Sequence, residues 1–127
     1  KKIRVSNCGL REALLSIGFA KDKKAMDYMM PYFSKLALKI RKPRMMGSAA
    51  LAMTYVASGR FQGYIESKVC LWDIAAGGLI LECAGGEFWR MPRTKGNYTY
   101  AVLASNGGIR KSIERVCGPL DPDGVLN

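Results

Sequence analysis

Short apolar runs that suit strands alternate along this chain with longer segments that suit helices, and this alternation limits the folds open to it. The apolar runs fit strands over residues 13–18, 41–47, 63–66, 87–91 and 100–105. Helical patterns lie over residues 23–40, 49–58, 73–84 and 108–117. Strands alternating with helices predict an α/β fold, with a largely parallel mixed sheet of about five strands flanked by helices.

Polar residues mark where the predicted helices begin. Asp22 and Ser48 precede helical patterns and suit the N-cap position, and Asp73 is predicted to cap the helix that runs to about Ala84. Pro31 lies inside the first helical pattern. Because proline lacks a backbone N–H, we expect Pro31 to kink or restart that helix.

The length of 127 residues corresponds to about one domain, and 49% hydrophobic with 24% charged residues is ordinary for a globular protein. No apolar run approaches the ~18 residues that a membrane helix needs, so we expect no membrane association. The sequence begins at Lys1 and enters a strand-like segment almost at once. This start indicates a segment of a longer protein.

Cysteine and histidine usage limits the chemistry. The four cysteines are dispersed and form no C-x-x-C pair, and the chain has no histidine. Paired zinc ligands and histidine-based nucleophilic triads are therefore absent. We expect reduced, mostly core-filling thiols in a cytoplasmic protein, although spacing alone does not exclude a disulfide.

The net charge of +10 is unevenly distributed. Residues 1–44 hold twelve Lys/Arg against three Asp/Glu, whereas residues 45–89 hold two against four. A basic flank can attract an anionic substrate, a nucleic acid or a membrane surface, but a solvated helix face explains such residues equally well.

The acidic middle third places polar groups where strands end and helices begin, which is where open α/β sheets bind ligands. Gly47, Ser48 and Ala49 start one helix, and their backbone N–H groups suit a hydroxyl or phosphate oxygen. Glu66 is predicted to end a strand, and Asp73 starts a helix seven residues later. A carboxylate at a helix start suits a hard cation such as Mg²⁺, but from these residues alone a simple N-cap is the favoured interpretation of Asp73.

The stretch from Arg44 to Phe88 resembles the carboxyl-terminal half of the inositol monophosphatase family, which are Mg²⁺-dependent phosphomonoesterases. The resemblance is carried by W-D-x-A-A-G at residues 72–77, G-S-A-A at residues 47–50 and Y-x-E at residues 64–66. Weaker similarity covers nearly all of the chain. The resemblance implies that residues 1–127 form one C-terminal α/β domain of an inositol monophosphatase-type sugar phosphatase fold, and that an N-terminal metal-binding domain is absent.

The resemblance also implies roles for individual residues. Asp73 corresponds to the catalytic aspartate that binds an active-site Mg²⁺, and Glu66 to the residue that binds a substrate hydroxyl. Gly47, Ser48 and Ala49 correspond to backbone that lines the substrate pocket. The family's other metal ligands, including those of a D-P-[IL]-D-G-T motif, do not occur here. The tail sequence D-P-D-G at residues 121–124 is interpreted as a turn.

The predicted function is Mg²⁺-dependent hydrolysis of inositol monophosphate or a related sugar phosphate by metal-activated water, as one half of an enzyme that is inactive alone. Gln62 and Cys83 depart from the family pattern and leave the substrate open. The alternatives are a 3'(2'),5'-bisphosphate nucleotidase, a fructose-1,6-bisphosphatase-type enzyme, or a non-catalytic basic module that binds nucleic acid or protein. Nucleic acid is the less favoured partner because no nucleic-acid motif occurs, and a homodimer is expected from the family.

Overall fold

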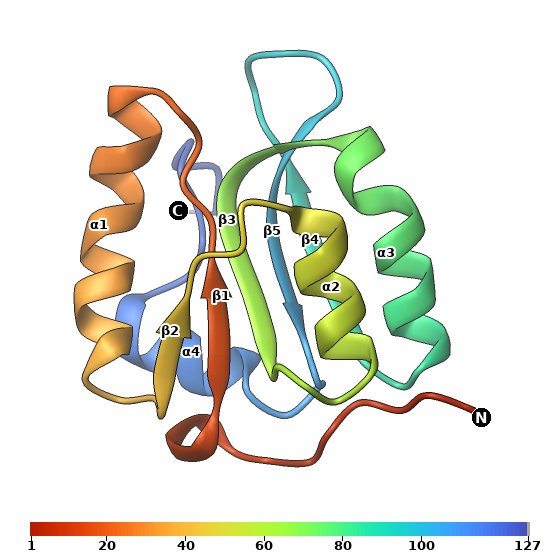
Figure 1. Ribbon diagram of the computed structural model, residues 1–127. Helices are drawn as coiled ribbons and strands as arrows, with labels where there is room; N and C mark the ends of the chain where they lie inside the picture. The colour runs from red at the N-terminus through yellow and green to blue at the C-terminus, as the bar shows by residue number, and fades with distance from the viewer. Residues whose placement is uncertain (127) are drawn as a thin grey trace.

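The computed structural model describes residues 1–126 and contains a five-stranded sheet with helices against both faces (Figure 1). The strands are β1 (Leu14–Ile17), β2 (Lys42–Arg44), β3 (Gly63–Cys70), β4 (Glu87–Pro92) and β5 (Thr99–Ser105). The helices are α1 (Lys23–Ala37), α2 (Ala49–Ala57), α3 (Leu71–Cys83) and α4 (Arg110–Cys117), with a short 3₁₀ helix over Leu10–Glu12. The α/β class predicted from the alternating pattern is confirmed.

The sheet is more mixed than predicted. Its strand order is β2-β1-β3-β5-β4, in which β1 pairs in parallel with β2 and β3. The strand β5 runs antiparallel to both of its neighbours, β3 and β4. The expectation of a largely parallel sheet is therefore corrected: β5 follows β4 through a short polar connection, and a connection of that length joins antiparallel strands.

Two hydrophobic clusters cover opposite faces of the sheet. One joins Ile65 and Leu103 to residues of α1 and α4, and the other joins Tyr64 and Val102 to residues of α2 and α3. Neighbouring residues of one strand thus enter different clusters, as the two-residue period of a strand requires. Figure 1 shows α1 with α4 on one side of the sheet and α2 with α3 on the other.

The predicted starts of the first two helices are confirmed. The side chain of Asp22 accepts a hydrogen bond from the backbone N–H of Ala25 at 2.8 Å, and Ser48 accepts one from Leu51 at 3.1 Å. The expectation that Pro31 restarts the first helix is wrong, because α1 is continuous from Lys23 to Ala37. Pro31 is exposed, so its ring projects from the outer side of the helix.

Asp73 does not cap its helix. The strand β3 runs directly into α3, whose N-cap is Cys70, so Asp73 is the third residue of the first turn. Glu66 likewise does not end its strand, because β3 continues to Cys70 through an irregularity in its pairing with β5 between Glu66 and Val69. Both predictions placed an element boundary at a candidate site carboxylate, whereas Glu66 lies within β3 and Asp73 within α3.

Three further expectations from the sequence concern the cysteines, the carboxyl-terminal tail and membrane helices. The four cysteines are free thiols, in line with the expected reduced state, but the expectation that most of them fill the core is wrong, because Cys8 and Cys83 are exposed and Cys70 and Cys117 are only half-buried. The tail turn is confirmed by a hydrogen bond of 3.2 Å from the N–H of Gly124 to the carbonyl of Asp121. No helix among residues 1–126 is both long and apolar enough to cross a membrane.

Candidate functional site

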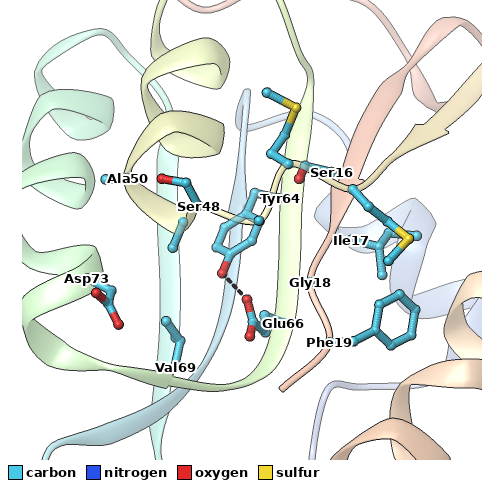
Figure 2. Close-up of a pocket in the computed structure, with 14 residues that line it drawn as sticks. Ser16, Ile17, Gly18, Phe19, Ser48, Ala50, Tyr64, Glu66, Val69 and Asp73 are labelled. Atoms are coloured by element: carbon cyan, nitrogen blue, oxygen red, sulfur yellow. Dashed lines mark hydrogen bonds between the residues drawn. The ribbon is translucent and has the colours of Figure 1, made fainter. Parts of the chain in front are cut away.

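A pocket of about 390 Å³ opens at the carboxyl end of β1, beside the middle of β3 and the first turns of α2 and α3 (Figure 2). All five residues singled out in the sequence line it: Gly47, Ser48, Ala49, Glu66 and Asp73. They come from three segments that are separated in the chain by up to 26 positions, and they meet because β1 pairs with β2 on one side and with β3 on the other. The structure thus places all five residues in one site.

Gly47 directs α2 toward the pocket. Its φ of +69° lies in the left-handed region, which glycine adopts without steric cost. This conformation lets the chain leave the β2 region and enter α2 at once, with Ser48 as N-cap. The first backbone N–H groups of a helix have no acceptor within the helix, so the segment at Ala49 and Ala50 offers donors at the pocket wall.

Glu66 and Tyr64 point from the same face of β3, two residues apart. The hydroxyl of Tyr64 donates a hydrogen bond to Oε1 of Glu66 (Figure 2). Burial raises the pKa of the Glu66 carboxyl, the hydrogen bond from Tyr64 opposes that change, and the negative charge of Asp73 adds to it. Glu66 is therefore a half-buried carboxyl whose ionised form is stabilised by the hydrogen bond from the Tyr64 hydroxyl.

Asp73 presents a carboxylate at the edge of the same pocket (Figure 2). Its side chain is exposed and takes part in none of the ion pairs found among residues 1–126. The first turn of α3 carries the positive end of the helix dipole, which favours a negative charge there. Asp73 is thus free to bind a cation or a ligand.

The carboxylates that line the pocket could supply part of a magnesium site. Asp73 and Glu66 supply hard oxygen ligands of the kind that Mg²⁺ prefers, but Mg²⁺ requires about six oxygens. Among residues 1–126 no group of three or more acidic, cysteine or histidine side chains could hold a metal ion. The remaining oxygens of a complete site would come from water, from the substrate or from another polypeptide segment.

Several pocket residues were not identified from the sequence. Ser16, Gly18 and Phe19 line the pocket from the carboxyl end of β1, and Met45 and Met46 line it from the segment before Gly47. The rule that ligands bind beyond strand ends could have identified Gly18 and Phe19, because Gly18 ends a predicted strand and Phe19 directly follows it. No local signal distinguishes the two methionines.

The two departures from the family pattern lie outside this pocket. Gln62 is buried directly before β3, and its Oε1 accepts a hydrogen bond from the N–H of Leu14 at 2.7 Å. Cys83 is exposed at the last turn of α3. Neither side chain lines the pocket, so neither departure alters the wall that a ligand would contact.

Comparisons of the sequence and of the structure with known proteins point to one family. A sequence model of the inositol monophosphatase family matches residues 1–117. "Phosphatase IMPL1, chloroplastic" of Arabidopsis thaliana is 38% identical over 120 residues, which cover 91% of this chain and 32% of that protein. "Putative Nus factor SuhB" of Neisseria meningitidis serogroup B is 40% identical over 88 residues, which cover 68% of this chain and 34% of that protein.

The solved structures agree with the sequence comparison. The inositol monophosphatase from Anabaena (Nostoc) sp. PCC 7120 superposes with a TM-score of 0.77 and 34% identity, covering 90% of this chain and 48% of that one. The chain therefore spans between about a third and a half of the proteins it matches.

Proposed function

Because this chain belongs to the inositol monophosphatase family, we propose that it is the carboxyl-terminal half of a phosphatase that hydrolyses a phosphate monoester. The observation that carries the proposal is the pocket of about 390 Å³ in which Asp73, Glu66 and the Gly47–Ser48–Ala49 segment meet. A cavity of this size accommodates a small phosphorylated sugar or cyclitol. Inositol monophosphate is the first candidate, with a nucleotide bisphosphate or fructose bisphosphate as the alternatives.

Asp73 would hold Mg²⁺ in this proposal, as the catalytic and metal-binding residue. Mg²⁺ bound there would offset negative charge on the phosphate and lower the pKa of a water molecule. The contribution of the chain is to present an unpaired carboxylate at the positive end of α3, fixed by the direct passage from β3 into the helix. The remaining ligands would come from a metal-binding domain outside this chain.

Glu66 and the start of α2 would bind the substrate. The Glu66 carboxylate can accept a hydrogen bond from a sugar or cyclitol hydroxyl while Tyr64 fixes its orientation. The free N–H groups at Ala49 can donate to a phosphate or hydroxyl oxygen, and Ser48 fixes the helix start by capping it. These contacts would orient the ester oxygen toward Asp73.

An apolar surface supports the proposal that another part of the protein covers α2 and α3. Trp72 is 71% exposed and Leu79 is 63% exposed on α3, and Leu51 on α2 is 41% exposed. Helices that are apolar on several sides are normally buried on several sides. We propose that the metal-binding domain packs on this surface and that the intact protein forms a homodimer.

The proposal is tested by Asp73→Asn in the intact protein, assayed with inositol monophosphate and Mg²⁺. We expect turnover to fall by at least a hundredfold, with unchanged circular dichroism, because a metal-facing charge is lost while the fold is kept. Glu82→Gln is the matched control, because it removes an exposed carboxylate from the other end of α3. Wild-type turnover in Asp73→Asn would overturn the assignment.

A second test uses residues 1–127 alone. With only part of a magnesium site, this segment should hydrolyse no substrate above background at millimolar Mg²⁺. Mixing it with the missing domain should restore turnover if the two halves reassemble. Robust activity of the purified segment alone would contradict the proposed division of the site.

A second candidate function is a basic binding module. It is favoured by the net charge of +10 and by the 40% identical relative whose name describes a Nus factor. This candidate predicts RNA binding that weakens steeply as salt rises from about 50 to 200 mM. Salt-dependent RNA binding that persists in Asp73→Asn would place this function beside the phosphatase activity and outside its pocket.

A further inference from the structure

A second hollow lies next to the candidate site and has a different character. It has a volume of about 220 Å³, and all of its lining residues are apolar: Phe19, Met26, Met30, Phe33 and Met45. We call this hollow the methionine groove. It contrasts with the neighbouring pocket, whose lining includes carboxylates and serines.

The methionine groove is continuous with the pocket. Phe19 and Met45 line both hollows. In Figure 2, Phe19 and Asp73 lie on opposite sides of the pocket with Glu66 between them. A ligand that places its phosphate near Asp73 and extends past Glu66 would therefore reach Phe19 and then the groove.

The groove is built to present apolar surface. Met26 and Met30 are four residues apart on α1, so they share one helix face, and they are 39% and 46% exposed. Phe19 packs against Phe33 with ring centroids 6.1 Å apart and an interplanar angle of 57°, which fixes the floor. Methionine side chains are flexible and polarizable, so they adapt to aromatic ligands of different shapes.

The groove is poorly suited to a fully hydroxylated substrate. A cyclitol carries hydroxyls around its ring, and a hydroxyl placed among Met26, Met30 and Phe33 would lose water without gaining a hydrogen bond. An aromatic or alkyl group would lose no hydrogen bond there and would bury apolar surface.

We propose that the methionine groove receives an aromatic group carried by the alcohol part of the phosphate ester, so that the enzyme prefers a monoester with such a group over an otherwise similar monoester that lacks it. This inference rests on the proposed phosphatase function and adds a substrate class to it. The groove acts as a specificity surface, and none of its exposed methionines is placed in the reacting machinery.

The test compares 2-phenylethyl phosphate with ethyl phosphate, two primary alkyl esters that differ by a phenyl group. In the intact protein with Mg²⁺, we expect wild-type kcat/KM to be about tenfold higher for the phenyl ester. The double variant Met26→Gln/Met30→Gln should lose most of that preference by slowing the phenyl ester alone. Both positions are exposed and glutamine is a good helix former, so the fold should persist.

Leu38→Gln is the matched control, because Leu38 is an 86% exposed apolar residue at the end of the same helix and outside the groove. It should leave the preference unchanged. Equal rates for the two esters in the wild type, or an equal loss for both in the double variant, would overturn the inference. A changed oligomeric state with unchanged preference would also overturn it and would identify the groove as a contact between copies.

A binding measurement separates this inference from the proposed function. If the wild type hydrolyses neither inositol monophosphate nor these two esters, the phosphatase proposal fails, and calorimetry with 2-phenylethylphosphonate and ethylphosphonate still tests the groove. Tighter binding of the phenyl compound that is lost in Met26→Gln/Met30→Gln supports the groove, and equal binding of the two compounds refutes it.

Discussion

Tyr64 and Glu66 lie two residues apart on one face of β3, and the Tyr64 hydroxyl donates a hydrogen bond to Oε1 of Glu66. Tyr64 is only 2% exposed, so its hydroxyl has little access to water. Burial and the charge of Asp73 raise the pKa of Glu66, while the Tyr64 hydrogen bond lowers it. Two neighbours thus act on the pKa of Glu66: Tyr64, on the same strand, lowers it, and Asp73, on α3, raises it.

Glu66→Gln should stabilise the fold at neutral pH. A carboxyl with a raised pKa in the folded state lowers stability as pH rises above its ordinary value of 4.5, because its ionised form is unfavourable there. The neutral amide avoids that cost, so the melting temperature should rise by a few degrees at pH 7 and match the wild type near about pH 3.5. Thermal unfolding of both proteins across this pH range measures the difference.

Tyr64→Phe is the partner experiment, because it removes the hydrogen bond that favours the ionised carboxylate. The pKa of Glu66 should then rise further, and the loss of stability toward neutral pH should be steeper than in the wild type. A Tyr64→Phe protein whose pH dependence is unchanged would show that the hydroxyl does not act on Glu66.

Gly18→Ala should damage substrate binding more than it damages the fold. A Cβ at Gly18 would overlap the carboxyl end of Glu66, which is a flexible side chain that can move away. The displaced carboxyl would no longer meet the substrate, so kcat/KM in the intact enzyme should fall about ten- to a hundredfold. Gly108→Ala is the control, because a Cβ there meets only Asn106 Oδ1 at 3.7 Å. Equal kinetics for the two variants would contradict the expected displacement.

The periodic pattern predicted the strands and helices because each depends on local physics. Asp22 and Ser48 act as caps through a hydrogen bond to a residue three positions ahead, which a sequence can specify. The position of Asp73 could not be settled in this way. The same residue type is favourable at an N-cap and in the first turn, and the choice depended on β3 entering α3 without a loop.

The residues of the candidate site likewise divide into those that the sequence could identify and those that it could not. Glu66 and Asp73 were identified because strand ends and helix starts concentrate ligand-binding groups, and because they belong to recognisable motifs. Met45 was not, because its place in the site depends on packing between α1 and the segment after β2. Apolar residues at such positions have the same sequence signature as an ordinary core.

Gln62→Leu should destabilise the fold by about 1–3 kcal/mol, the usual cost of leaving a buried polar group unpaired. Gln62 is 5% exposed, and its amide joins the N–H of Leu14 at 2.7 Å to the Ser6 hydroxyl at 3.0 Å. Leucine would fill the space but would leave the Leu14 N–H without its acceptor. Urea unfolding at pH 7 measures the change.

Ser6→Ala supplies the comparison for that experiment, since it removes the hydroxyl and keeps the bond to Leu14. Its effect should stay below about 1 kcal/mol, because Ser6 is half-buried and water can replace it. If Ser6→Ala costs as much as Gln62→Leu, the contact with the start of β1 is not the source of the stability.

Asp123→Asn should loosen the carboxyl-terminal tail and flatten the acid dependence of stability. The Arg93 guanidinium donates to both carboxylate oxygens of Asp123, at 2.8 and 3.2 Å, and Thr94 N–H donates at 3.0 Å. These contacts lower the pKa of Asp123 from 3.8 to about 2, so the stability they provide is present above pH 3.8 and is lost as pH falls toward 2. Both side chains are largely buried, at 13% and 11% exposure, so we expect a loss of about 1–2 kcal/mol at pH 7 and almost none near pH 2. Asp27→Asn, which breaks an exposed pair with Lys23, should cost clearly less than Asp123→Asn. Equal losses in the two variants would show that the Asp123 contacts add nothing beyond an ordinary surface pair.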